Sequence, residues 1–181
     1  MNAVIELREA LRGWWEMLAA NKGGANRFNV SRDGLITALI WFGAAVAITL
    51  FVQNAMRELP TYGAMFVSVA ANTLPMAGLL LAIYGSALVL DAEGGFLGLA
   101  VPAVYATSIV FIIDLPISLA FGDLFANLKY GILGYMLFRV ARDCGKLGIG
   151  VSIAFAVLGI VALAALYAAL YMLTVPAPPA A

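Results

Sequence analysis

Apolar residues in this chain form one short periodic segment followed by long continuous runs. In the periodic segment, at about residues 3–20, they recur at steps of three and four, which predicts an amphipathic helix. Its apolar stripe comprises Val4, Leu7, Leu11, Trp14 and Leu18, with Trp15 beside it. Acidic residues, Arg8 and Arg12 make the segment too polar to span a membrane. We expect it to lie in the headgroup plane or against a bundle, with Trp14 and Trp15 as interfacial anchors.

Five continuous runs follow, at about residues 35–52, 62–90, 96–113, 124–140 and 149–174. A helix of about 18 residues covers roughly 27 Å, just enough for the hydrocarbon core of a bilayer. Ser31 or Asp33 can cap the first run, and the third is expected to end at Pro116, because the residue before a proline avoids helical geometry.

The pattern therefore predicts an all-α membrane protein. Residues 1–26 form an N-terminal interfacial amphipathic helix and a linker, residues 27–175 form a five-helix transmembrane bundle, and residues 176–181 form a Pro/Ala tail. In the alternative, the fourth run, which carries Asn127 and Lys129, lies flat on the surface and only four segments span.

The placement of the basic residues favours five spans. With the N-terminus inside, eight of the ten basic residues are cytoplasmic: Arg8, Arg12, Lys22, Arg27, Arg32, Arg139, Arg142 and Lys146. This arrangement agrees with the positive-inside rule. We expect a bacterial inner-membrane protein with a cytoplasmic N-terminus.

The composition excludes most other classes of protein. Hydrophobic residues make up 64% of the 181 residues and charged residues 11%, against about 25% charged in soluble domains. There is no histidine and a single cysteine, Cys144, which removes the usual metal, haem and thiol chemistry. No phosphate loop or nucleophile elbow occurs. We expect no enzyme, no cofactor and no nucleic-acid partner.

Two groups of polar residues are candidates for an intramembrane site. Asn72 and Thr73 precede Pro75 in the second run, while Asp114, Asp123 and Lys129 gather around the far end of the third and fourth runs. An ionisable group at membrane depth suggests function. The alternatives are a structural proline kink and charges that mark helix ends in the headgroup zone.

Arg139, Arg142 and Lys146 fall at helical spacing on the cytoplasmic side. Together with Arg8 and Arg12 they are candidates for contacts with anionic lipid headgroups. The alternative is that they only orient the chain.

The entry to the first run, Arg-Phe-Asn-Val-Ser-Arg-Asp-Gly at residues 27–34, has an aromatic-x-x-Ser-x-Asp-Gly pattern. With the amphipathic helix before it and five runs after it, the chain resembles Yip1-like integral membrane proteins. The resemblance implies a role in membrane organisation or trafficking without a catalytic site. The chain lacks the proline expected soon after this entry.

Two functions remain open at this point. The first is a non-enzymatic scaffold or accessory subunit that contacts anionic lipid, with another membrane protein or a second copy of the chain as partner. The second is a small-molecule transporter, or its substrate-binding membrane component, in which Asn72, Thr73 and Asp114 would line the path.

Overall fold

The computed structural model describes residues 3–19, 23–55, 62–121 and 127–174, and these residues contain helices and no strand. The elements are α1 (Ala3–Leu18), η1 (Gly24–Arg27), α2 (Arg32–Ala55), α3 (Tyr62–Val89), α4 (Gly95–Phe121), α5 (Leu128–Arg139), the π-helical turn η3 (Val140–Cys144) and α6 (Ile149–Thr174). The predicted all-helical class is confirmed for this part of the chain.

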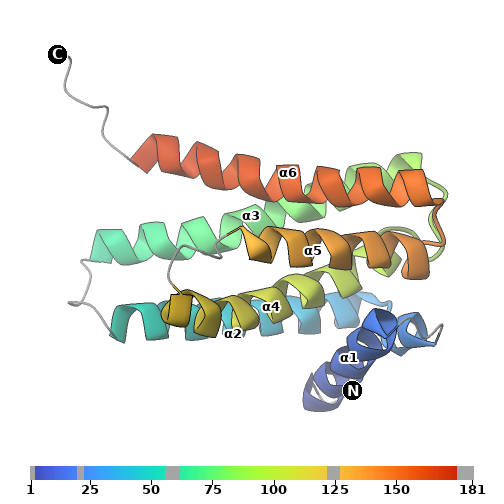
Figure 1. The fold of residues 1–181 in the computed structure, drawn as a ribbon, viewed down its shortest axis with the longest axis horizontal. Coiled ribbons are helices and arrows are strands. Elements are labelled where there is room, and N and C mark those ends of the chain that lie inside the picture. Colours follow the sequence, from blue (N-terminus) through green and yellow to red (C-terminus); the bar gives the residue numbers. More distant parts are fainter. Residues whose placement is uncertain (1–2, 20–22, 56–61, 122–126, 175–181) are drawn as a thin grey trace.

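Helices α2 to α6 lie side by side and alternate in direction, while α1 lies obliquely at the end where α2 begins (Figure 1). The closest pairs are α2 with α4 and α3 with α6, and α5 packs against both α4 and α6. At the end that carries α1, the Glu93 amide donates a hydrogen bond of 3.1 Å to the Gly145 carbonyl. This bond joins the α3–α4 turn to the segment between η3 and α6.

Within the described ranges, four helices are long and apolar enough to cross a membrane: α2, α3, α4 and α6. The twelve residues of α5 extend only about 18 Å, which is less than the hydrocarbon core. The predicted fourth run, 124–140, begins in residues 124–126, outside the described part of the chain. The count of five spans therefore stays a prediction.

Helix α4 forms the centre of the bundle. In the most apolar stretch of α4, 67% of the residues are buried inside the protein. In the corresponding stretch of α3 the share is 22%. Leu99, Val101, Val104 and Tyr105 are almost completely buried. The other three long helices therefore leave most of their apolar surface outside, as helices in contact with lipid do.

The expected end of the third run at Pro116 is wrong, because α4 continues through Pro116 to Phe121. The residues after Pro116 are apolar. In a membrane, an unpaired backbone group costs several kcal/mol, so losing the one hydrogen bond at proline is better than unwinding a whole turn. Asp114 therefore lies within a helix.

The start of α2 is capped as expected. The Ser31 hydroxyl accepts a hydrogen bond of 3.0 Å from the Gly34 amide, in the N-cap manner. A Cβ on Gly34 would collide with the carbonyl of Asn29. Serine and glycine together let the incoming chain turn tightly onto the helix.

Candidate functional site

The best-defined polar arrangement outside the bundle is formed by α1 and η1, which we call the α1–η1 cap. One face of α1 is buried against the bundle: Glu6, Ala10, Gly13, Trp14 and Met17. The Trp14 ring is 2% exposed and meets Phe28 edge to face, at 6.0 Å between centroids. Trp14 therefore contacts protein.

A second apolar face of α1 is exposed. Its members are Val4, Leu11, Trp15 and Leu18, and the Trp15 side chain is 76% exposed. The stripe expected from the sequence is thus divided, with Trp14 inside the protein and Trp15 outside. Helical periodicity alone shows that the apolar arc is wide; it does not show which half the bundle covers.

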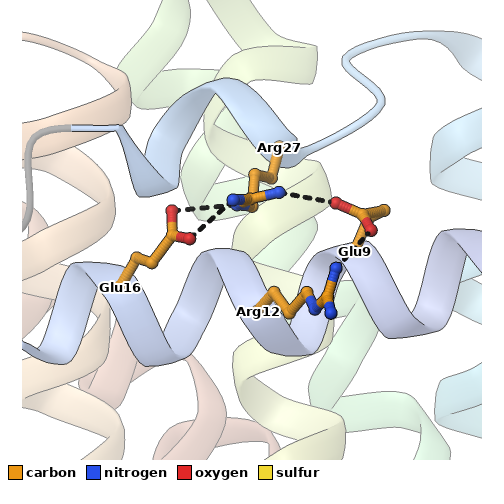
Figure 2. A network of polar contacts seen from close by, with 4 residues as sticks. All are labelled: Glu9, Arg12, Glu16 and Arg27. Atoms are coloured by element: carbon orange, nitrogen blue, oxygen red, sulfur yellow. Dashed lines mark hydrogen bonds and ion pairs between the residues drawn. The ribbon is translucent and has the colours of Figure 1, made fainter.

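A network of ion pairs joins α1 to η1 (Figure 2). The Arg27 guanidinium lies 2.8 Å from the Glu9 carboxylate and 2.7 Å from that of Glu16. Arg12 adds a longer contact to Glu9, 3.5 Å. The hydrogen bond from Arg27 lowers the pKa of Glu16, and both carboxylates raise the pKa of Arg27. We call these four side chains the Arg27 network.

Two glycines make this network possible. A Cβ on Gly24 would lie 2.6 Å from the Gly13 carbonyl, and a Cβ on Gly13 would lie 2.9 Å from the Gly24 carbonyl. The two backbones therefore touch, and this close approach brings Arg27 within reach of both carboxylates. The sequence indicated a linker here; its glycines are the only sequence signal for the contact.

The buried end of α1 contains polar groups with few partners. Glu6 is 4% exposed and accepts a long hydrogen bond of 3.4 Å from the Asn29 amide. Among the described residues, Trp14 Nε1 and the Tyr105 hydroxyl are buried without a hydrogen-bond partner. The Trp41 indole donates to the Ala3 carbonyl at 3.2 Å, which fixes the start of α1 against α2.

The basic residues that follow α5 have partners of their own. Arg139 donates to Asp143 at 2.7 Å and to the Tyr135 hydroxyl at 3.2 Å, and Arg142 donates to the Leu147 carbonyl at 2.6 Å. The Lys146 side chain pairs with no carboxylate in the described residues, and its backbone has φ +54°. Of these three residues predicted to contact lipid, Lys146 is the one whose charged group has the fewest partners among the described residues.

Cys144, the only cysteine, lies within η3. Burial, and to a lesser extent the nearby Asp143 charge, raise the pKa of its thiol to about 12. At neutral pH the side chain is a thiol, which is a poor nucleophile.

The predicted intramembrane residues divide into two separate places. Asn72 donates to the Ser68 carbonyl at 2.7 Å and Thr73 to the Val69 carbonyl at 2.8 Å, both one turn back in α3. Asp114 and Lys129 do meet, at 3.2 Å, and join α4 to α5. Among the described residues no hydrogen bond or ion pair links the two places. Asp123 lies outside the described residues.

Two hollows lined by described residues are not deep clefts. One is a shallow groove on the α1–η1 cap, lined by residues that include Leu7, Arg8, Leu11 and Arg12. The other lies beside Asp114 and Lys129, and its inner space of about 10 Å³ suits roughly one water molecule. Neither is lined by the residues around Pro75.

No group of three metal-binding side chains occurs in the described part of the chain. Comparison with family models, with curated proteins and with solved structures found no match for this chain. The arguments about function therefore rest on its own residues.

Proposed function

We propose that this chain is a non-enzymatic polytopic membrane protein, a scaffold or accessory subunit, that contacts anionic lipid at the end carrying the α1–η1 cap. The observation that carries the proposal is the gathering of charge. The described basic residues other than Lys129 lie on α1, η1, the start of α2 and the segment from Arg139 to Lys146. Arg8 and Lys146 pair with no described carboxylate, so their charges are open to phosphate groups.

We further propose five crossings with a cytoplasmic N-terminus. Helices α4 and α6 run in the same direction (Figure 1), so the chain must return between them. The proposal is that α5, with the residues on either side of it, makes this return. The Yip1-like resemblance would suit such a protein and stays a prediction.

Cysteine labelling tests the crossings. In a Cys144→Ala background, we expect Asp91→Cys and Gly148→Cys to react with an impermeant maleimide only after the membrane is opened. Gln53→Cys should react in intact spheroplasts. If Gly148→Cys reacts in intact spheroplasts while Asp91→Cys does not, the five-crossing topology is wrong.

Lipid retention tests the contacts. The native chain and the R8Q/K146Q variant are each placed in nanodiscs with phosphatidylglycerol and then purified. The variant should carry roughly tenfold less bound phosphatidylglycerol than the native chain. The matched control, R8K/K146R, keeps both charges and should retain it. Equal retention by R8Q/K146Q would contradict the lipid contacts.

A transporter would need a cavity reaching mid-membrane between α3 and α4. The hollows described above lie elsewhere. Asn72 and Thr73 bond within their own helix, as expected for a structural kink. The observations favour the scaffold.

A further inference from the structure

The exposed face of α1 is a single stripe. Val4, Leu11, Trp15 and Leu18 are spaced by seven, four and three residues, which places them on one side of the helix. Their side chains are exposed by 64%, 47%, 76% and 43%. Large apolar side chains gathered in this way mark a contact surface on a folded protein.

The protein itself cannot cover this stripe by turning α1. Arg27 contacts two carboxylates that lie about two turns apart on α1, Glu9 and Glu16, and the glycine contact seats η1 against the helix. On the other side, Trp14 and Met17 are buried in the core. A rotation that buried Trp15 would break the ion pairs and expose Trp14. The described residues therefore leave the stripe uncovered.

The stripe is bordered by charged side chains. Arg8 and Arg12 lie next to it, and they line one shallow groove together with Val4, Leu11 and Trp15, with Glu16 and Arg27 also in the lining. An apolar face flanked by arginines and carrying a tryptophan is the composition of helices that lie in a membrane interface. The phosphates of lipid headgroups complement the arginines, and acyl chains complement the stripe.

The stripe also continues the outer surface of the bundle. Trp41 binds the Ala3 carbonyl, and it lies nine residues along α2, roughly 13 Å from the start of that helix. Its neighbours Ile36 and Ile40 are exposed by 56% and 62% on this apolar helix. The start of α1 is thus attached beside a surface that faces lipid if α2 spans the membrane.

We propose that α1 is inserted in the bilayer leaflet at the end of the bundle where α2 begins, with Trp15 among the lipids and Trp14 against the protein. The inference rests on the proposed membrane location and names the occupant of the exposed face, a lipid leaflet. Arg8 and Arg12 then lie at the level of the phosphates.

Tryptophan fluorescence tests this placement, because the chain has three tryptophans and each can be kept alone. The W14F/W41F variant retains Trp15, and its matched control, W15F/W41F, retains Trp14. In nanodiscs of brominated phospholipid we expect Trp15 emission to fall roughly twofold, with the larger effect for bromines near the headgroup. Trp14 emission should change little, and aqueous iodide should quench neither.

Quenching of Trp15 by iodide without quenching by bromolipid would overturn the proposal and leave the stripe open to a protein partner. If the tryptophan variants do not fold, a spin label on Leu11→Cys in the Cys144→Ala background replaces them. Greater exposure of that label to a water-soluble relaxation agent than to oxygen would overturn the proposal equally. Iodide quenching with normal phosphatidylglycerol retention would refute the placement of α1 alone and leave the proposed function standing.

Discussion

Backbone geometry at two single residues explains how the chain turns so tightly before α2 and before α6. Gly34 lies against the Asn29 carbonyl at the start of α2, and Lys146 adopts a positive φ of 54° between η3 and α6. Glycine suits the first position because it has no Cβ. Lysine at the second position is unusual, because a side chain there raises the energy of the left-handed conformation.

Alanine at Gly34 should destabilise the protein. Its Cβ would strike the Asn29 carbonyl, and we expect a loss of about 2 kcal/mol in the free energy of unfolding. Gly43 on the same helix provides the control, because a Cβ added there would meet nothing within 4 Å. Gly43→Ala should be neutral or slightly stabilising. Thermal unfolding in detergent, followed by circular dichroism, compares the two; equal melting temperatures would contradict the expectation.

Glycine at Lys146 should stabilise the fold relative to alanine at the same position. Both remove the ammonium group, but only glycine relieves the left-handed backbone, so K146G should exceed K146A by about 1 kcal/mol. For a chain of this length that difference raises Tm by about 2–4 °C. The same melting experiment measures it, and a K146A variant as stable as K146G would show that this backbone stores no strain.

At the scale of elements, α1 and η1 behave as one unit because their backbones touch. The unit is held by contacts of two kinds, the glycine approach and the Arg27 network. Each kind can be removed separately, so each gives a prediction.

Gly24→Ala should loosen α1, since its Cβ would lie 2.8 Å from the Met17 amide and 2.6 Å from the Gly13 carbonyl. We expect the emission of Trp14, in the W15F/W41F background, to shift to longer wavelength as water reaches the ring. The neighbouring Gly23→Ala is the matched control, because its Cβ approaches only the Glu16 carboxylate, at 4.0 Å. The same shift in both variants would contradict the role of the glycine contact.

Acid should also release α1. Because Arg27 lowers the pKa of Glu16, the ion pair stabilises the folded state above the ordinary glutamate pKa of about 4.3. That stability is lost as the pH falls further, through the lowered folded pKa. Trp14 emission should therefore stay constant from neutral pH to about 4.3 and shift below it.

Arg27→Gln provides the control for the acid experiment. Without the guanidinium, the ion pairs of Arg27 with Glu9 and Glu16 are absent, so the component of the transition that they cause should disappear. An acid transition identical in the native protein and R27Q would exclude the Arg27 network as its cause.

The whole molecule is organised around α4, and the Asp114–Lys129 pair attaches the shortest bundle helix to it. The two side chains are exposed by 23% and 37%, so the pair lies at the surface of the bundle and not in its core. The pair attaches α5 to α4 at a point where the surrounding sequence is apolar.

A double-mutant cycle measures this attachment. D114N and K129Q should each lower the free energy of unfolding by about 1 kcal/mol, because each leaves its partner unpaired. The double variant D114N/K129Q should lose less than the sum of the two. Strict additivity in thermal unfolding would show that the pair contributes nothing.

Much of the helical framework follows from the sequence, and its departures have physical causes. The runs predicted at 62–90 and 149–174 agree with α3 and α6, because long apolar runs leave few alternatives to a helix. Pro116 misled the expectation for α4, since the local preference of a proline is overruled where unpaired backbone groups are costly.

The α1–η1 cap could be predicted only in part. Residue spacing predicted α1 and its wide apolar arc. The division between Trp14 and Trp15 depends on how α1 is rotated, and that rotation is set by Arg27 and Gly24, which lie beyond the helix itself. The order of the apolar runs places Asp114 and Lys129 near one another, and the structure pairs them; their separation from Asn72 depends on how α3 packs.

The hydrogen bond between Glu93 and Gly145 has a consequence for synthesis of the chain. A ribosome releases the α3–α4 turn well before Gly145 emerges, so the Glu93 amide has no native acceptor while α5 is being made. The hairpin of α3 and α4 is therefore completed by a late segment. A nascent chain that stops before Gly145 lacks the carbonyl that accepts from the Glu93 amide, so its α3–α4 turn is held by fewer contacts than in the whole chain.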